Sequence, residues 1–229
     1  MTRLQIKNRF RQENPEISTN VISDTVLDSW LLEGNINAAT TARLIKGDNV
    51  ASNIESVVSQ AQYDLSTITK FYDIDELPGG GVAYNDKRLT VTTIAELDET
   101  RPSWRTASAG TPKRYYRRNQ YIYLEPKPDT ANLDIDIYSV NLPDDFDDDA
   151  KTPFNQLTHL APFHYSLVLY LQWRAKAKLA KPEERDNALA IYDKYITWMK
   201  NEVDRNIYHA IQFKPSSGYL PTSGMRRPR

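Results

Sequence analysis

Apolar residues recur at a helical spacing in the first fifth of the chain. From Leu27 to Ile45 they return near every 3.6 positions, the period of a helix with one buried face. Ser23 or Asp24 is suited to cap the start of this helix, and Gly47, followed by an aspartate, is suited to close it. Gly34 lies inside the pattern and weakens the helix, because glycine is a poor helix former.

The same helical pattern returns in the last third of the chain. An apolar stripe runs from Leu157 to Leu179, Pro182 interrupts it, and a second stripe runs from Ala188 to Val203. Because so few residues separate the two stripes, the pattern predicts a pair of antiparallel helices.

The segment between these helical regions has the pattern of short strands. Gly and Pro clusters alternate there with β-branched and aromatic runs, and Leu133–Val140 alternates apolar and polar residues as a half-buried strand does. Residues 49–61 fit either a helix or a hairpin strand from Val57 to Tyr63, and Thr93 with Glu96 could cap one short helical turn. Strands are predicted at Ile68–Ile74, Gly81–Tyr84, Tyr121–Leu124 and Leu133–Val140.

These patterns predict an α+β fold, mainly an α-helical bundle with an inserted small antiparallel β-rich module and an extended C-terminal arm. The N-terminal helices and the C-terminal helical pair are separated by about 90 residues, so we expect them to pack together and to carry the β module as an outgrowth. The expected parts are an N-terminal helical part (1–53), the β-rich module (54–142), an acidic loop with the C-terminal helical hairpin (143–213), and the arm (214–229).

Composition narrows the classes of function. Among 229 residues, 29 are Lys or Arg and 30 are Asp or Glu, and this balance argues against coating nucleic acid or anionic membrane by bulk charge. There is no cysteine, which excludes disulfides and thiolate chemistry. No apolar run approaches the roughly 20 residues of a membrane span, so we expect a soluble, intracellular chain without membrane contact.

The charges are nevertheless segregated along the chain. Arg101–Arg118 holds six basic residues and no acid, whereas Asp129–Asp149 holds eight aspartates and no base. The two blocks could pair within one subunit or between subunits, or both could be solvated surfaces. The candidate subunit-interface residues are Arg114, Arg117, Arg118, Asp144, Asp145, Asp147, Asp148 and Asp149.

The sequence offers little catalytic or cofactor chemistry. His159 and His164 are five positions apart, which does not suit two metal ligands on one helical face, and no nucleotide-binding or nucleophile motif occurs. The aspartate run from Asp144 fails the EF-hand pattern, although a looser divalent-ion site stays open. We expect no enzyme, cofactor or metal site. The alternatives are a nucleic-acid-binding module at Lys113–Tyr123 and, with less support, a carboxylate-based glycan hydrolase.

Several segments, in order and spacing, resemble the head-to-tail adaptor proteins of tailed phages. The central resemblance runs from Pro102-Ser-Trp104 through Gly110-Thr-Pro-Lys-Arg-Tyr-Tyr116 to Tyr121-Ile-Tyr-Leu-Glu-Pro-Lys-Pro-Asp129. Trp30–Asn35, Gln62–Leu65, Leu89–Asp98 and Ala150–Pro153 agree with the flanks, although Ser66 replaces the proline expected after the tyrosine-x-leucine strand entry. The resemblance covers residues 20–205 and favours strands over a helix in 54–65.

The resemblance implies a structural virion protein at the head-tail junction, assembled in the host cytoplasm. Similar proteins form a ring, usually of twelve subunits, beneath the portal protein. The ring extends the channel through which genomic DNA passes without sequence-specific binding. Downstream tail or nozzle proteins attach to the ring. The arm has no helical period but carries apolar residues, so we expect it to become ordered on a partner. The implied portal-binding residues are Lys214, Tyr219, Leu220, Met225, Arg226, Arg227 and Arg229.

Overall fold

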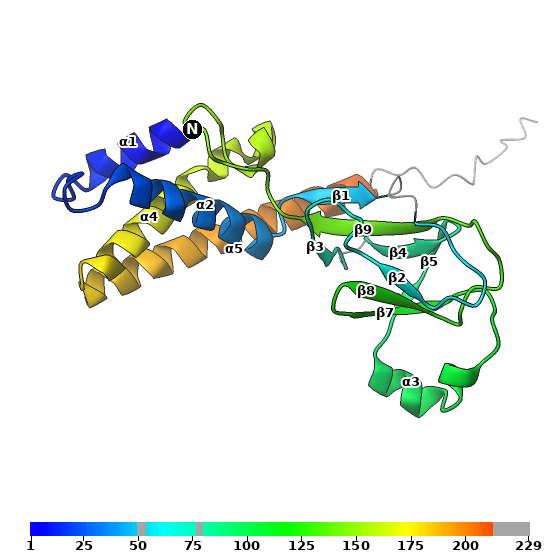
Figure 1. The fold of residues 1–229 in the computed structure, drawn as a ribbon. Coiled ribbons are helices and arrows are strands. Elements are labelled where there is room, and N and C mark those ends of the chain that lie inside the picture. The colour runs from blue at the N-terminus through cyan, green and yellow to red at the C-terminus, as the bar shows by residue number, and fades with distance from the viewer. Residues whose placement is uncertain (50–53, 77–79, 213–229) are drawn as a thin grey trace, which may run out of the picture.

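The computed structural model describes residues 1–49, 54–76 and 80–212. They form two parts, one made of helices and one of β-sheets, and Figure 1 shows the two lying side by side. The α+β class predicted from the sequence is confirmed. The predicted C-terminal arm (214–229) lies outside the described residues, and with it all the implied portal-binding residues: Lys214, Tyr219, Leu220, Met225, Arg226, Arg227 and Arg229.

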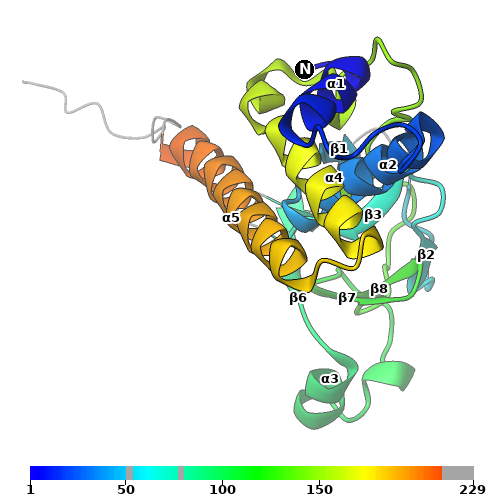
Figure 2. The same ribbon diagram turned by 90° about the vertical axis from the view of Figure 1, so that its left-hand side faces the viewer.

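The helical part is built from both ends of the chain. Its helices are α1 (Arg3–Glu13), α2 (Asp24–Thr41), α4 (Tyr165–Lys178) and α5 (Pro182–Gln212). Their apolar side chains form one buried cluster that includes Phe10, Leu31, Leu167 and Met199. Helix α4 packs against the other three helices, and α4 and α5 form the predicted antiparallel pair (Figure 2). The N-terminal and C-terminal helices therefore pack on each other in the structure.

Helix α2 ends earlier than the sequence pattern indicated. It stops at Thr41 because Arg43 adopts a left-handed backbone conformation (φ 51°), and the Leu44 amide turns back to donate to the Ala39 carbonyl. Gly47 and its neighbours form strand β1 (Lys46–Asn49), which lies N-terminal of the expected start of the β module at residue 54. The prediction that Gly47-Asp48 closes the helix was wrong, since these residues pair with a strand about 90 positions away.

The predicted helix from Leu157 also begins later than expected. The segment before α4 forms two short 3₁₀ turns, η2 (Phe154–Gln156) and η3 (Thr158–Phe163). Pro162 lies inside η3, and an α-helix from Leu157 would place this proline in its interior, where it lacks the required amide donor. The regular helix therefore starts only at Tyr165.

The β part consists of two sheets. In the first, β9 (Ile135–Asn141) is central and pairs antiparallel with β1, β3 (Phe71–Ile74) and β4 (Gly81–Tyr84), and β4 pairs with β5 (Lys87–Arg88). The second sheet has the order β2-β8-β7-β6; its strands are Gln62–Asp64 (β2), Tyr121–Glu125 (β8), Arg114–Arg118 (β7) and Thr90–Val91 (β6). The predicted module was antiparallel, but β6 and β7 pair in parallel.

The sheets share one buried apolar cluster, separate from the helical core. It includes Tyr63, Val82, Tyr115, Ile122 and Ile137, so side chains from both sheets contribute to it. The four strands predicted from the sequence are present, with ends shifted by a few residues in three of them. In the ambiguous segment, residues 54–61 contain no helix, so the helical interpretation was wrong. The strand expected from Val57 to Tyr63 is present only at its end: Glu55 makes an isolated bridge to Asp134, a turn follows, and β2 begins at Gln62.

A short helical excursion stands away from the second sheet. It contains α3 (Ile94–Thr100) and the 3₁₀ turn η1 (Trp104–Thr106), and Figures 1 and 2 both show α3 projecting from the β part. One of the two hydrogen bonds of the predicted capping box is formed: the Thr93 hydroxyl accepts a hydrogen bond from the Glu96 amide. The Glu96 carboxylate accepts a hydrogen bond from the Thr92 hydroxyl.

Candidate interaction surfaces

The basic strand β7 divides its arginines between two faces of the sheet. Tyr115 points into the core between the sheets, where burial raises its pKa to about 12, and Arg117 follows two residues later on the same face. Arg114 and Arg118 lie on the opposite face with Tyr116. A single basic block in the sequence therefore supplies two separate surfaces in the structure.

Arg117 is held by groups of its own chain. Its guanidinium forms an ion pair with Asp73, donates to the carbonyl oxygens of Tyr72 and Asn119, and lies 5.0 Å from the ring centroid of Phe71. Asp73 also pairs with Arg43, at 2.6 Å. These contacts join β3 to the β7–β8 turn, so Arg117 contributes to the packing of the module.

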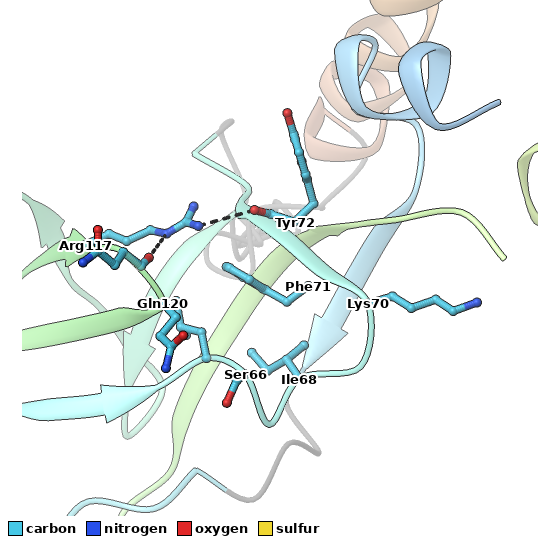
Figure 3. A pocket seen from close by; sticks show the side chains of 9 residues that line it. Ser66, Ile68, Lys70, Phe71, Tyr72, Arg117 and Gln120 are labelled. Atoms are coloured by element: carbon cyan, nitrogen blue, oxygen red, sulfur yellow. Dashed lines mark hydrogen bonds between the residues drawn. The ribbon is translucent and has the colours of Figure 1, made fainter. Parts of the chain in front are cut away.

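An open pocket of about 390 Å³ lies next to Arg117, between the β2–β3 loop and the β7–β8 turn (Figure 3). Its floor is apolar, with Leu65, Ile68 and Phe71, and its rim carries polar groups from Ser66 and Gln120. The lining includes neither a carboxylate nor a histidine. Lys70, Tyr72, Arg117 and Asn119 complete the lining.

The outer face of the second sheet carries an aromatic cluster. Tyr116 stacks on Tyr123 with ring centroids 4.8 Å apart, and Trp104 meets Tyr116 edge-on at 5.8 Å. Arg105 lies 4.5 Å from the Trp104 ring and pairs with Asp98. Tyr116 is buried, which raises the pKa of its hydroxyl, so this ring is packed inside the protein. Within Lys113–Tyr123, much of the aromatic surface proposed for base stacking is consequently used inside the protein.

Three aspartates of the acidic loop are bound by lysines of the same chain. Asp144 pairs with Lys70 at 2.6 Å, Asp147 with Lys151 at 2.5 Å, and Asp149 with Lys7 at 2.7 Å. The hydrogen bond from Lys151 holds the pKa of Asp147 below its usual range. Asp145 and Asp148 are exposed on the same loop.

The two charge blocks therefore find their partners elsewhere in the chain. Within the described ranges, no ion pair joins Arg101–Arg118 to Asp129–Asp149; the basic block pairs instead with Asp73, Asp98 and Glu125.

A buried charge network at the base of the acidic loop was not anticipated from the sequence. Arg3 and Lys7, one helical turn apart on α1, are almost fully buried, and both contact one carboxylate oxygen of Asp28, at 3.1 and 3.0 Å. Lys7 also binds Asp149. Burial lowers the pKa of Lys7, but hydrogen bonds to Asp149 and Asp28 outweigh this and leave the pKa raised. The network fastens the loop to α1 and α2.

The described part of the chain offers no group of three or more metal-ligating side chains suited to hold an ion. His164 precedes α4, is buried, and accepts a 2.6 Å hydrogen bond at Nδ1 from the terminal ammonium of Met1. Asp144 and Asp145 line a small polar pocket, but the Asp144 side chain is 64% exposed and ion-paired.

The comparisons with known proteins assign the chain to a family. No curated protein matches the chain. None of the described helices is both long and apolar enough to cross a bilayer. The SU10 adaptor protein family matches residues 1–210, which takes in the helical part and both sheets. This range exceeds the segment, 20–205, over which the sequence itself resembles phage adaptors. The chain therefore belongs to the SU10 adaptor protein family, a family of structural phage adaptors.

Proposed function

We propose that this protein is a head-to-tail adaptor, twelve copies of which form a ring beneath the portal. The match to a phage adaptor family over residues 1–210 carries the proposal. The ring extends the channel for the genomic DNA and provides the platform to which tail or nozzle proteins attach. The two separate cores support such a role, because a helical layer and a β layer can meet different neighbours.

The C-terminal arm, residues 214–229, is the segment that we propose to bind the portal. It combines four basic residues with an apolar group and has no acid. Such a segment suits an anionic groove with apolar pockets on the partner. The contact residues of this proposal are Lys214, Tyr219, Leu220, Met225, Arg226, Arg227 and Arg229.

We also propose that basic residues of β7 meet the acidic loop of a neighbouring subunit. Four residues of the two blocks already form ion pairs within the chain: Arg117, Asp144, Asp147 and Asp149. We therefore propose that Arg114 and Arg118 in β7 pair with Asp145 and Asp148 in the loop of the neighbouring subunit. Exposed pairs of this kind fix orientation more than they add affinity.

Light scattering tests the proposal directly. The mass of the chain is measured alone and after mixing with portal rings of the same phage, and a stoichiometric complex of portal and adaptor rings is expected. A chain that stays unbound at every portal concentration would contradict the adaptor function. In that case a steep salt dependence of DNA binding would favour the nucleic-acid-binding alternative.

A further inference from the structure

Acidic side chains gather at the end of the β part that lies away from the helices. Glu55 forms an isolated bridge with Asp134, whose carbonyl oxygen accepts a hydrogen bond from the Asn85 amide. Asp86 follows Asn85 in the turn between β4 and β5, and Asp136 lies near the start of β9. Figure 1 shows β9 running from this end toward the helical part. We call the four acids the acidic tip: Glu55, Asp86, Asp134 and Asp136.

The charge of the acidic tip is not neutralised within the described part of the chain. No ion pair there reaches any of its four carboxylates, whereas Asp73 and Asp98, elsewhere in the β part, are each paired with an arginine. Two cations lie close by in the sequence. Lys87 is exposed, and the guanidinium of Arg88 lies 5.5 Å from the ring centroid of Tyr138. The tip therefore presents negative charge that a partner can neutralise.

Asp136 is buried in this acidic surrounding. It is only 5% exposed, and its Oδ1 atom has no hydrogen-bond partner among the described residues. Burial, followed by the charges of Asp134 and Asp86, raises the pKa of Asp136. Because alternate residues of an extended chain point to the same side, Asp136 shares its side with Asp134. A buried carboxylate without a partner costs free energy, which a bound cation would recover.

A tight turn beside the acids exposes two apolar side chains. Val57 and Val58 are each 50% exposed. The turn is held against the segment that leads into β9, since the Ser56 amide donates to the Leu133 carbonyl oxygen at 2.9 Å and the Leu133 amide donates to the Ser56 hydroxyl at 3.0 Å. The valines are therefore fixed at the surface next to unpaired acids, a combination suited to a partner that is both apolar and basic.

The chemistry of the acidic tip selects among possible occupants. The described residues include no group of three or more ligating side chains suited to hold a metal ion. The phosphates of nucleic acid would be repelled by the acids. An arginine of another protein fits both features, because its guanidinium can pair with carboxylates while its apolar stem lies along the valines.

We propose that the acidic tip binds a basic segment of a partner protein, with an arginine of that segment paired to Asp136. Asp134 and Asp86 contribute further negative charge, and Val57 and Val58 contact the apolar atoms of the segment. This proposal goes beyond the adaptor function and requires neither a ring nor a portal.

Titration with a tetra-arginine peptide with blocked ends tests the proposal on the full chain. Changes in backbone amide NMR shifts are expected around Asp136 and Val57, and they should saturate. Asp136→Asn should weaken peptide binding by about fivefold or more, and Asp134→Asn, at an exposed position, should weaken it as well. The matched control is Asp193→Asn, which removes the same charge from an exposed position of α5 and should change the affinity by less than about twofold.

Three results would overturn the proposal. Shifts that avoid the acidic tip would mean that the peptide binds elsewhere. Equal losses of affinity in the variants of Asp136, Asp134 and Asp193 would mean that only net charge matters. The same Asp136-dependent shifts with calcium chloride in place of the peptide would assign the tip to a metal ion. The portal is absent from this experiment, so failure here leaves the adaptor function intact.

Discussion

Gly34 of α2 lies directly against the ring of Tyr170 on α4. A methyl group at position 34 would come within 2.8 Å of Cδ1 of this ring and within 3.3 Å of a methyl carbon of Leu167. The sequence marks Gly34 as a weak point of its helix, and the structure explains why glycine stands there. Because Gly34 has no side chain, α2 and α4 can approach closely enough to bury Tyr170.

We therefore expect Gly34→Ala to destabilise the protein even though alanine is the better helix former. Overpacking costs about 1–3 kcal/mol and the gain in helix propensity is about 1 kcal/mol, so the free energy of unfolding should fall by about 1 kcal/mol. Urea unfolding measures it. Ser29→Ala, at an exposed position of the same helix, is the control and should leave stability unchanged or slightly higher. A Gly34→Ala variant more stable than wild type would contradict the close packing.

The buried network at α1 predicts a large effect at Asp28. Asp28→Asn removes the negative charge that Arg3 and Lys7 share, and should lower the free energy of unfolding by about 2 kcal/mol, since the nearly buried Arg3 loses its carboxylate partner and Lys7 keeps only Asp149. Asp24→Asn on the same helix breaks only an exposed pair with Arg11 and should cost less than about 0.5 kcal/mol. Equal effects from the two substitutions would show that burial does not govern this network.

His164 should make stability depend on pH between about 6.5 and 4. Burial, followed by the nearby terminal ammonium, lowers the pKa of His164 to about 4. Below its ordinary pKa the unfolded chain binds a proton that the folded chain does not, so this residue's contribution is present above pH 6.5 and is lost as the pH falls toward 4. The corresponding free energy is about 3 kcal/mol.

His164→Gln removes this titration. The difference in unfolding free energy between wild type and His164→Gln should shrink as the pH is lowered from 7 to 4.5, with carboxylate titration common to both proteins. His159→Gln is the control, since His159 is exposed. A pH-independent difference would mean that His164 is not buried in its neutral form.

Arg117 and Arg118, adjacent in β7, should differ in what they stabilise. Arg117→Ala removes the contacts with Asp73, Phe71 and the Asn119 carbonyl, and should lower the free energy of unfolding by about 1–2 kcal/mol. Arg118→Glu should leave stability within about 0.5 kcal/mol and weaken ring assembly on portal. Thermal unfolding and light scattering separate the two effects. Undiminished assembly of Arg118→Glu would argue against the charge contact between subunits.

Deletion of residues 214–229 should abolish portal binding. A milder variant, with Arg226, Arg227 and Arg229 replaced by serine, should bind more weakly and with less dependence on salt, because fewer ion pairs contribute. Sedimentation with portal rings measures both. Wild-type binding by the deletion variant would show that the portal contacts another part of the chain.

Several elements could be predicted from the sequence because their signals are local. The 3.6-residue period gives α2, α4 and α5, the alternation in Leu133–Val140 gives β9, and the turn signals around Gly81–Tyr84 give β4. The resemblance to phage adaptors, carried by the order of short motifs, agrees with the family match. Such features depend on residues close together in the chain.

The partners of the charged residues were decided only by the tertiary structure. The sequence shows two opposite charge blocks, but the fold places Arg117 against Asp73 and Lys7 between Asp28 and Asp149, and it pairs Gly47 with a strand residue 92 positions away. Each of these contacts joins segments far apart in the chain, and many partners of opposite charge were available to each. The burial of apolar surface dominates the folding energy, so the two apolar cores determine which backbone segments come together. The charged side chains then pair with whichever opposite charges lie nearby, because surface ion pairs contribute little free energy.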